Sequence, residues 1–273
     1  MTEKAPDWLG LAGRSVLVSG VKNRRSVAFH IGRQLTEAGC EVIYSVRTEA
    51  RRDELQKRLA PSPIYVCDVT KDDELERLGA SLESHAPLAG VVHSIAYGDY
   101  TEEPKPFRET SRQQFLGAVD VSCYSLIALS RAVEGRLADD ASVVAISISS
   151  TQLAAENYGF MAPAKAALDS TIVFLAKSFS DKTRVRFNGV AASPLKTASS
   201  AGIPGYLESY LYAEAATLRK EGVRTDEVAS TAVFLLSPRS AGVNATSVVV
   251  DAGMGKNFFD REIVERVNRE AVR

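Results

Sequence analysis

Short apolar runs alternate with longer stretches of helical periodicity along nearly the whole chain, and this alternation limits the possible fold more than any other feature. Each run is short enough for a strand and apolar on both faces. Strands are predicted at residues 14–20, 41–46, 64–67, 88–95, 141–148, 185–192 and 247–251. Helices are predicted at residues 26–38, 49–59, 71–84 and 158–180, over a long stretch ending near Leu137, and at residues 225–236. Such strands, joined by helices, are typical of a parallel sheet covered on both sides.

The predicted fold is therefore α/β: a single doubly wound, Rossmann-like domain over residues 1–273, with a parallel sheet of about seven strands and helices on both faces. No linker, repeat or low-complexity segment divides the chain. Residues 97–110 and 194–222 interrupt the alternation. A connection as long as the second is typical of a lid or binding loop. The charge-alternating tail from Lys256 is compatible with a surface helix or a subunit contact.

Composition excludes several classes of protein. The formal net charge of −1 gives no overall attraction to nucleic acid or to an anionic membrane. No apolar run approaches about 18 residues, the length of a membrane helix, and residues 1–10 carry no signal-peptide core. Cys40, Cys67 and Cys123 are odd in number, far apart and without a CxxC pair, so neither a disulfide framework nor a metal site is expected. We expect a soluble cytoplasmic protein without nucleic-acid, membrane or metal partners.

The first strand-to-helix turn, residues 19–28, is the place where a doubly wound sheet binds a pyrophosphate on helix N-terminal amides. Gly20 allows close backbone approach, and Ser26 can either cap the helix or bond a phosphate. The turn has one glycine instead of a full GxGxxG, so an ordinary turn is the alternative interpretation.

The ends of the next strands carry further candidates for a dinucleotide site. Arg47 ends the second strand with no acid before Glu49, and an arginine there accommodates a ribose 2′-phosphate, which favours NADPH. A solvated cluster at a helix start is the alternative. Asp68 follows the third strand, where it can cap a helix or bond adenine, and Ser94 closes the fourth. His93 is interpreted as a core-edge histidine because the chain has no GxSxG elbow.

Tyr158 and Lys165 are the candidate catalytic pair. Their separation of seven positions is about two turns of the predicted helix, so both side chains are expected on one face. A nearby ammonium favours the phenolate and would bring the tyrosine pKa down from about 10 toward the range useful for general acid catalysis. The alternative is a partly buried tyrosine beside a lysine whose ammonium reaches solvent.

With these features the chain resembles the enoyl-acyl-carrier-protein reductases of the short-chain dehydrogenase/reductase superfamily. The resemblance covers nearly the whole chain, and its most specific element is the six-residue gap between Tyr158 and Lys165. Ordinary members of the superfamily have a three-residue gap, and that position here is Ala162. Further matching segments are Gly20-Val21, Ser26-Val27-Ala28, Cys67-Asp68-Val69, Val92-His93-Ser94-Ile95, residues 120–125, Phe187-Asn188, residues 193–197 and residues 250–253.

The resemblance implies a role for each matching position. Tyr158 would hydrogen-bond the carbonyl oxygen of an enoyl thioester, while Lys165 would bind the nicotinamide ribose and help to stabilise the developing enolate. Leu195 would offer backbone groups to the nicotinamide carboxamide, with Thr197 beside the pyrophosphate, and residues 194–222 would cover the acyl chain. The other implied cofactor positions are Gly20, Ser26, Val27, Arg47, Asp68, Val69, Ser94 and Ala96.

The implied activity is reduction of an enoyl thioester in fatty acid biosynthesis, with NADPH favoured over NADH. The substrate would be carried by acyl carrier protein, and the assembly would be a homotetramer. Four departures bear on the substrate more than on the fold: Ile148 replaces a second tyrosine of the best-known branch, and Ala96, Ser193 and His30 replace glycines near the cofactor. Two alternatives stay open: a short-chain reductase of another enone or carbonyl in secondary metabolism, and a non-catalytic dinucleotide-binding protein.

Overall fold

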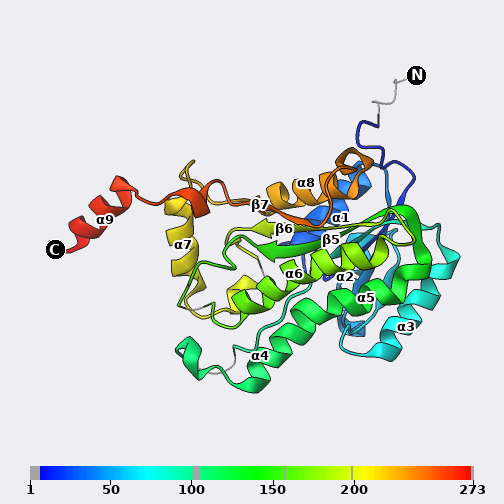
Figure 1. The fold of residues 1–273 in the computed structure, drawn as a ribbon, viewed down its shortest axis with the longest axis horizontal. Coiled ribbons are helices and arrows are strands. Elements are labelled where there is room, and N and C mark those ends of the chain that lie inside the picture. The colour runs from blue at the N-terminus through cyan, green and yellow to red at the C-terminus, as the bar shows by residue number, and fades with distance from the viewer. Residues whose placement is uncertain (1–6, 101–104, 157, 198, 272–273) are drawn as a thin grey trace.

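The computed structural model describes residues 7–100, 105–156, 158–197 and 199–271, with the backbone alone for 267–271. Its centre is a seven-stranded sheet in the order β3-β2-β1-β4-β5-β6-β7, and every neighbouring pair of strands is parallel (Figure 1). The strands are β1 (Ser15–Ser19), β2 (Glu41–Val46), β3 (Ile64–Val66), β4 (Leu88–His93), β5 (Leu137–Ile148), β6 (Arg186–Ala192) and β7 (Thr246–Val250). The predicted doubly wound α/β fold is confirmed.

Helices cover both faces of the sheet and form two apolar layers with it. The α-helices of the described residues, which include α7 and α9 outside these layers, are α1 (Val27–Glu37), α2 (Glu49–Leu59), α3 (Asp72–Ser81), α4 (Arg112–Val119), α5 (Ser125–Val133), α6 (Met161–Phe179), α7 (Tyr206–Ala216), α8 (Thr225–Leu236) and α9 (Arg261–Ala271). Alternate residues of β1 point to opposite faces. Val16 and Val18 belong to the cluster that includes α1 and α8, whereas Leu17 belongs to the cluster with α3, α5 and α6.

The helix predicted to end near Leu137 is interrupted. A π-helical turn at Asp120–Tyr124 separates α4 from α5, and a 3₁₀ turn at Glu134–Arg136 follows. β5 therefore begins at Leu137, earlier than the predicted residue 141. The stretch Arg112–Arg136 is long and apolar enough to cross a membrane by length and composition, but half of its most apolar window is buried inside the molecule, as in the core helix of a folded domain.

The two irregular segments lie at the edges of the fold. Of residues 97–110, positions 101–104 lie outside the described residues, and a 3₁₀ turn spans Phe107–Glu109. Between β6 and α8 the chain makes a 3₁₀ turn at Ser200–Gly202 and then forms α7, which stands beyond the layers at the end of the sheet (Figure 1). The tail ends in α9, which projects away from the sheet (Figure 1).

Candidate active site

The carboxyl ends of the first four strands surround a cavity of about 280 Å³. Ligands of open α/β sheets bind at this edge, beside the point where the strand order reverses, which here is between β1 and β4. The lining residues are Gly20, residues 45–47, residues 67–70, residues 95–97 and Val121. The cavity thus brings together five of the predicted cofactor positions, namely Gly20, Arg47, Asp68, Val69 and Ala96.

Gly20 is required by both conformation and space. Its φ is +99°, and a Cβ added there would lie 2.2 Å from the carbonyl oxygen of Ser94. The amide of Ser94 in turn donates to the carbonyl oxygen of Ser19 at 3.1 Å. Any side chain at position 20 would therefore push apart the ends of β1 and β4, which flank the cavity.

The first strand-to-helix loop leads into α1, whose N-cap residue is Ser26. The Ser26 hydroxyl donates to the carbonyl oxygen of Asn23 at 2.6 Å and accepts from the amide of Lys22 at 3.4 Å, so it shapes the loop. Val27 begins α1 and is buried. Among the described residues no side chain caps α1, and its first turn carries no acid. Its amides and dipole therefore favour an anionic group at this end.

Arg47 and Asp68 meet at the cavity wall. Arg47 Nε donates to Asp68 Oδ2 at 3.2 Å, and Asp68 Oδ1 accepts from the amide and hydroxyl of Thr70 at 3.1 and 2.8 Å. Although partial burial opposes ionisation, the Thr70 hydrogen bonds and the Arg47 charge lower the pKa of Asp68 below its ordinary value. The N-cap of α3 is Lys71, so the helix-cap interpretation of Asp68 is wrong.

A second arginine links α2 to the first loop. Arg51 Nη1 donates to the carbonyl oxygen of Lys22 at 2.9 Å and to the carboxylate of Glu54. Arg47 itself has 71% of its side chain exposed. Two guanidinium groups therefore lie on the adenosine side of the predicted site, one tied to the loop and one at the cavity wall.

Lys165 of α6 is buried, with only 3% of its surface exposed. Its Nζ donates to the carbonyl oxygen of Ile146 on β5 at 2.8 Å and to that of Ile95 after β4 at 3.4 Å. Burial lowers the pKa of Lys165 to about 8. Because Ile95 also lines the cavity, the ammonium lies directly beside the predicted cofactor site.

Tyr158 precedes α6 instead of lying within it. The helix begins at Met161, and the intervening Gly159 has a φ of +38°, which is outside the helical range. The Met161 amide donates to the carbonyl oxygen of Tyr158 at 3.1 Å, so a turn joins the tyrosine to the helix. The prediction that Tyr158 and Lys165 share one helix face is therefore wrong.

The prediction of a lowered tyrosine pKa is also wrong. Burial, together with the nearby phenols of Tyr100 and Tyr206, raises the pKa of Tyr158 above its ordinary value. Tyr158 therefore stays neutral at physiological pH and is a hydrogen-bond donor.

Tyr100 stacks on Phe160 with ring centroids 5.2 Å apart, and its buried hydroxyl has no hydrogen-bond partner within the described part of the chain.

Both backbone groups of Leu195 bond one tyrosine hydroxyl. The Leu195 amide donates to Tyr206 Oη at 2.8 Å, and Tyr206 Oη donates to the Leu195 carbonyl oxygen at 3.0 Å. Ser200 Oγ also donates to that carbonyl oxygen, at 2.8 Å, and accepts from the amide of Thr197 at 2.9 Å. Sequence analysis placed Tyr206 in the covering segment but missed this pairing, since nothing in the sequence links positions 195 and 206.

His93 is fully buried at the end of β4. Its Nε2 lies 2.7 Å from Ser125 Oγ, which donates to the carbonyl oxygen of Val121 at 2.6 Å, so Nε2 carries the donated proton. Burial, and then the charge of Lys165, lower the pKa of His93 to about 3. The histidine is therefore neutral and belongs to the core behind the site.

A buried serine on β5 was missed by sequence analysis. Ser147 has no hydrogen-bond partner for its hydroxyl within the described residues, and it alternates to the same face of the sheet as Ala145, toward α6. It directly follows Ile146, whose carbonyl oxygen accepts from Lys165. Ser147 is one of two serines in the apolar run at residues 141–148, and nothing in the sequence distinguishes it. Ile148 alternates to the opposite face.

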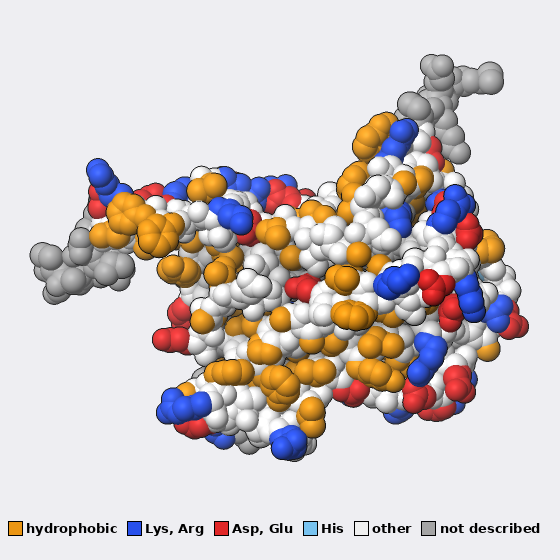
Figure 2. Space-filling model, in the orientation of Figure 1, with side chains coloured by type: hydrophobic (Ala, Val, Ile, Leu, Met, Phe, Trp, Pro, Cys, Tyr) orange, Lys and Arg blue, Asp and Glu red, His pale blue; other side chains and the backbone are white. Residues whose placement is uncertain are grey.

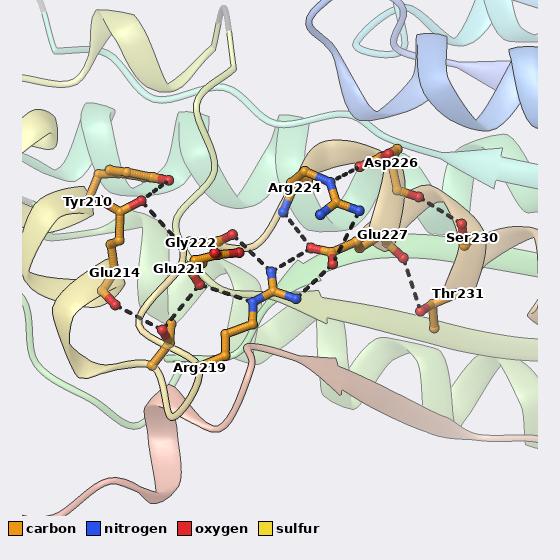
Figure 3. Close-up of polar contacts among 11 residues, drawn as sticks. Tyr210, Glu214, Arg219, Glu221, Gly222, Arg224, Asp226, Glu227, Ser230 and Thr231 are labelled. Atoms are coloured by element: carbon orange, nitrogen blue, oxygen red, sulfur yellow. Dashed lines mark hydrogen bonds and ion pairs between the residues drawn. The ribbon is translucent and has the colours of Figure 1, made fainter.

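Ion pairs fix the far end of the 194–222 segment (Figure 3). Arg219 donates to both carboxylate oxygens of Glu227 on α8, at 2.7 Å each, and to the carbonyl oxygens of Glu221 and Gly222. The hydrogen bonds from Arg219 lower the pKa of Glu227 to about 2. The chain after α7 is therefore held to the body of the protein through α8.

The residues present fit a nicotinamide dinucleotide. A cavity lies at the carboxyl ends of the strands, with an uncapped helix N-terminus and a buried ammonium beside it; Arg47 lines the cavity, and Arg51 is bound to the loop that leads into the helix. Within the described parts of the chain, no group of three or more His, Cys, Asp or Glu side chains is placed to hold a metal ion. The site is therefore suited to a phosphate-bearing organic cofactor.

Comparison with known proteins gives the family. A profile described as Enoyl-(Acyl carrier protein) reductase matches residues 20–255. The enoyl-[acyl-carrier-protein] reductase [NADPH] FabI of Staphylococcus aureus is 32% identical over 254 residues, which cover 90% of this chain and 98% of the relative. The enoyl-[acyl-carrier-protein] reductase [NADH] FabI of Bacillus subtilis is 34% identical over 249 residues, which cover 89% and 96%.

Solved structures agree with the sequence relatives. The crystal structure of enoyl-[acyl-carrier-protein] reductase (NADH) from Aquifex aeolicus VF5 matches with a TM-score of 0.87 at 30% identity, covering 92% of this chain and 99% of that one. The chain belongs to the enoyl-acyl-carrier-protein reductase family of the short-chain dehydrogenase/reductase superfamily.

Proposed function

We propose that this protein reduces the carbon–carbon double bond of an enoyl thioester with NADPH, in cytoplasmic fatty acid biosynthesis. One observation carries the proposal. In this member of the family the ammonium of Lys165 is buried beside the cavity, where it donates to the carbonyl oxygens of Ile95 and Ile146. Tyr158 lies just before α6, the helix that carries Lys165. A charge buried in this way costs stability, and such groups cluster at functional sites.

Tyr158 and Lys165 act on the charge that develops on the substrate. When bound, the nicotinamide would supply a hydride to the carbon β to the thioester carbonyl, and the enolate formed would take up a proton from water at the α carbon. Neutral Tyr158 donates a hydrogen bond to the thioester oxygen, where negative charge accumulates as the double bond is reduced. Lys165 binds the ribose hydroxyls, and because its pKa is about 8 it is mostly charged at neutral pH and stabilises the same oxygen.

The remaining predicted positions divide between the two halves of the cofactor. Gly20, Ser26 and Val27 bind the phosphates at the N-terminus of α1, and Asp68 and Val69 hold adenine. The exposed guanidinium of Arg47 pairs with a ribose 2′-phosphate, which supports NADPH over NADH. The nicotinamide half lies against Ser94, Ala96 and Leu195, and Thr197 lies beside the pyrophosphate.

Residues 194–222 cover the acyl chain, which acyl carrier protein delivers. Within this segment α7 exposes three apolar side chains, because Leu207, Leu211 and Tyr212 have 61%, 51% and 68% of their surface exposed. An acyl chain provides an apolar surface that such side chains can cover.

The assembly is a homotetramer, with the face of α4, α5 and α6 as one contact between copies. Apolar side chains gather on this face (Figure 2). They include Leu116, Tyr124, Val173 and Phe174, and Phe174 has 74% of its surface exposed. Exposed apolar side chains grouped on adjacent helices mark interaction sites, and a second copy offers the same apolar surface in return.

The proposal is tested by following NADPH absorbance with crotonyl thioesters of coenzyme A and of acyl carrier protein. We expect oxidation of NADPH with the enoyl thioesters, faster on the carrier protein. An acetoacetyl thioester, which offers a carbonyl in place of the double bond, should give no oxidation. Turnover of the acetoacetyl substrate alone would indicate a carbonyl reductase, and no turnover of any substrate would indicate a non-catalytic protein.

A further inference from the structure

We infer that the Tyr206 hydroxyl is a latch that competes with the nicotinamide carboxamide for the backbone of Leu195. The inference rests on the proposed function, because it takes Leu195 as the carboxamide site. It assigns Tyr206 a role beyond covering the acyl chain: cofactor binding must break this contact before the covering segment can close over a substrate.

The latch and the carboxamide require the same two backbone groups. The Tyr206 hydroxyl accepts from the Leu195 amide at 2.8 Å and donates to the Leu195 carbonyl oxygen at 3.0 Å. A carboxamide also offers one acceptor oxygen and N–H donors. The Leu195 amide has a single hydrogen, so it cannot make a full hydrogen bond to both partners at once.

Because Leu195 is buried, loss of its contact with Tyr206 has an energetic cost. Only 7% of its surface is exposed, and a buried amide left without a partner is destabilising. Ser200 Oγ and the Thr197 amide also donate to the carbonyl oxygen of Leu195, so that group keeps two partners when Tyr206 leaves. The amide depends on Tyr206 alone among the described residues, and an incoming carboxamide replaces that bond directly.

The latch acts at one end of α7. Tyr206 is the first residue of the helix and follows Gly205, whose φ is +66°. At the other end, Leu218 donates its amide to the carbonyl oxygen of Ala252 at 2.9 Å, and Arg219 is bound to α8 (Figure 3). Breaking the latch therefore removes a contact at the N-terminal end of α7 and leaves these contacts at its C-terminal end in place.

The test measures binding of NADPH and of 2′-phospho-ADP-ribose, which lacks the nicotinamide, by calorimetry with wild type and Tyr206→Phe. We expect the variant to bind NADPH about tenfold more tightly, the equivalent of one net hydrogen bond, with no change for 2′-phospho-ADP-ribose. Tyr210→Phe is the matched control, because its hydroxyl on the same helix bonds Glu214 instead of Leu195, and it should change neither affinity.

A Tyr206→Phe protein that binds 2′-phospho-ADP-ribose normally but NADPH no more tightly than wild type would overturn the latch and leave the proposed function standing. If wild type bound neither ligand, the proposed function would fail and the latch with it. Hydrogen exchange of wild type gives a second readout that needs no variant. NADPH should speed exchange over residues 199–209, and 2′-phospho-ADP-ribose should not; equal exchange with both ligands would also overturn the latch.

Discussion

Lys165 Nζ lies 2.8 Å from the carbonyl oxygen of Ile146 and 3.4 Å from that of Ile95, so one buried ammonium joins the carboxyl ends of two adjacent strands. Its distance from solvent lowers its pKa to about 8, with Asp169 and Cys123 opposing the shift. The lysine is therefore held in place at an energetic cost, as expected for a group kept for binding and catalysis.

The energetic cost of burying the Lys165 ammonium predicts that the free energy of unfolding depends on pH. The unfolded lysine keeps its proton up to about pH 10.5, whereas the folded one loses it near 8. Between these values the unfolded state binds more protons, so this residue makes the free energy of unfolding rise with pH, and below 8 its full penalty applies. Lys165→Met should raise that free energy by roughly 1–3 kcal/mol at pH 7. Denaturant titrations at pH 7 and 10 test this; an equal effect of the substitution at both pH values would contradict it.

Tyr158→Phe should lower turnover by about 10²–10³ with little change in cofactor affinity, because it removes one donor to the developing enolate. Because the pKa of Tyr158 is raised, deprotonation of this tyrosine should produce no alkaline limb in the rate profile near neutral pH. Steady-state rates and calorimetry measure the two quantities separately. Wild-type turnover in this variant would place the oxyanion partner elsewhere.

Arg47→Gln should weaken NADPH binding by about tenfold and leave NADH nearly unchanged, since a charge-assisted bond to the 2′-phosphate is lost. Because Arg47 is exposed, we expect no larger loss of NADPH affinity than this, and the loss should become smaller as the salt concentration rises. Arg52→Gln is the matched control, because Arg52 pairs with Glu49 and Asp53 on α2. Equal losses for NADPH and NADH would mean that Arg47 acts only through its ion pair with Asp68.

Phe174→Glu should reduce the assembly to smaller species, because it puts a charge into the exposed apolar face of α4, α5 and α6. Lys177→Glu is the control on the same helix, where Lys177 pairs with Asp181 at the surface. Light scattering coupled to size exclusion gives the molar mass of each. A mass equal to wild type for Phe174→Glu would exclude this face as a contact between copies.

The sheet was predictable because apolar runs such as residues 15–19 are buried on both faces, as in a parallel sheet between helices. The start of α6 could not be predicted, because it is set by the positive φ of Gly159. The hydrophobic periodicity of a sequence does not show the backbone conformation of a single glycine. The direction of the Tyr158 pKa depends on burial, which is set by distant segments. The contact of Tyr206 with Leu195 joins a loop to a helix end and likewise leaves no local pattern.

The most direct test of the central claim follows the reducing hydrogen itself. Wild-type protein is given crotonyl thioester and NADPH carrying deuterium at both C4 positions, and the product is analysed by mass spectrometry and NMR. The proposed reaction predicts a butyryl thioester with one deuterium, on the carbon β to the carbonyl. Deuterium on a carbinol carbon, or no labelled product at all, would contradict reduction of the double bond by this site.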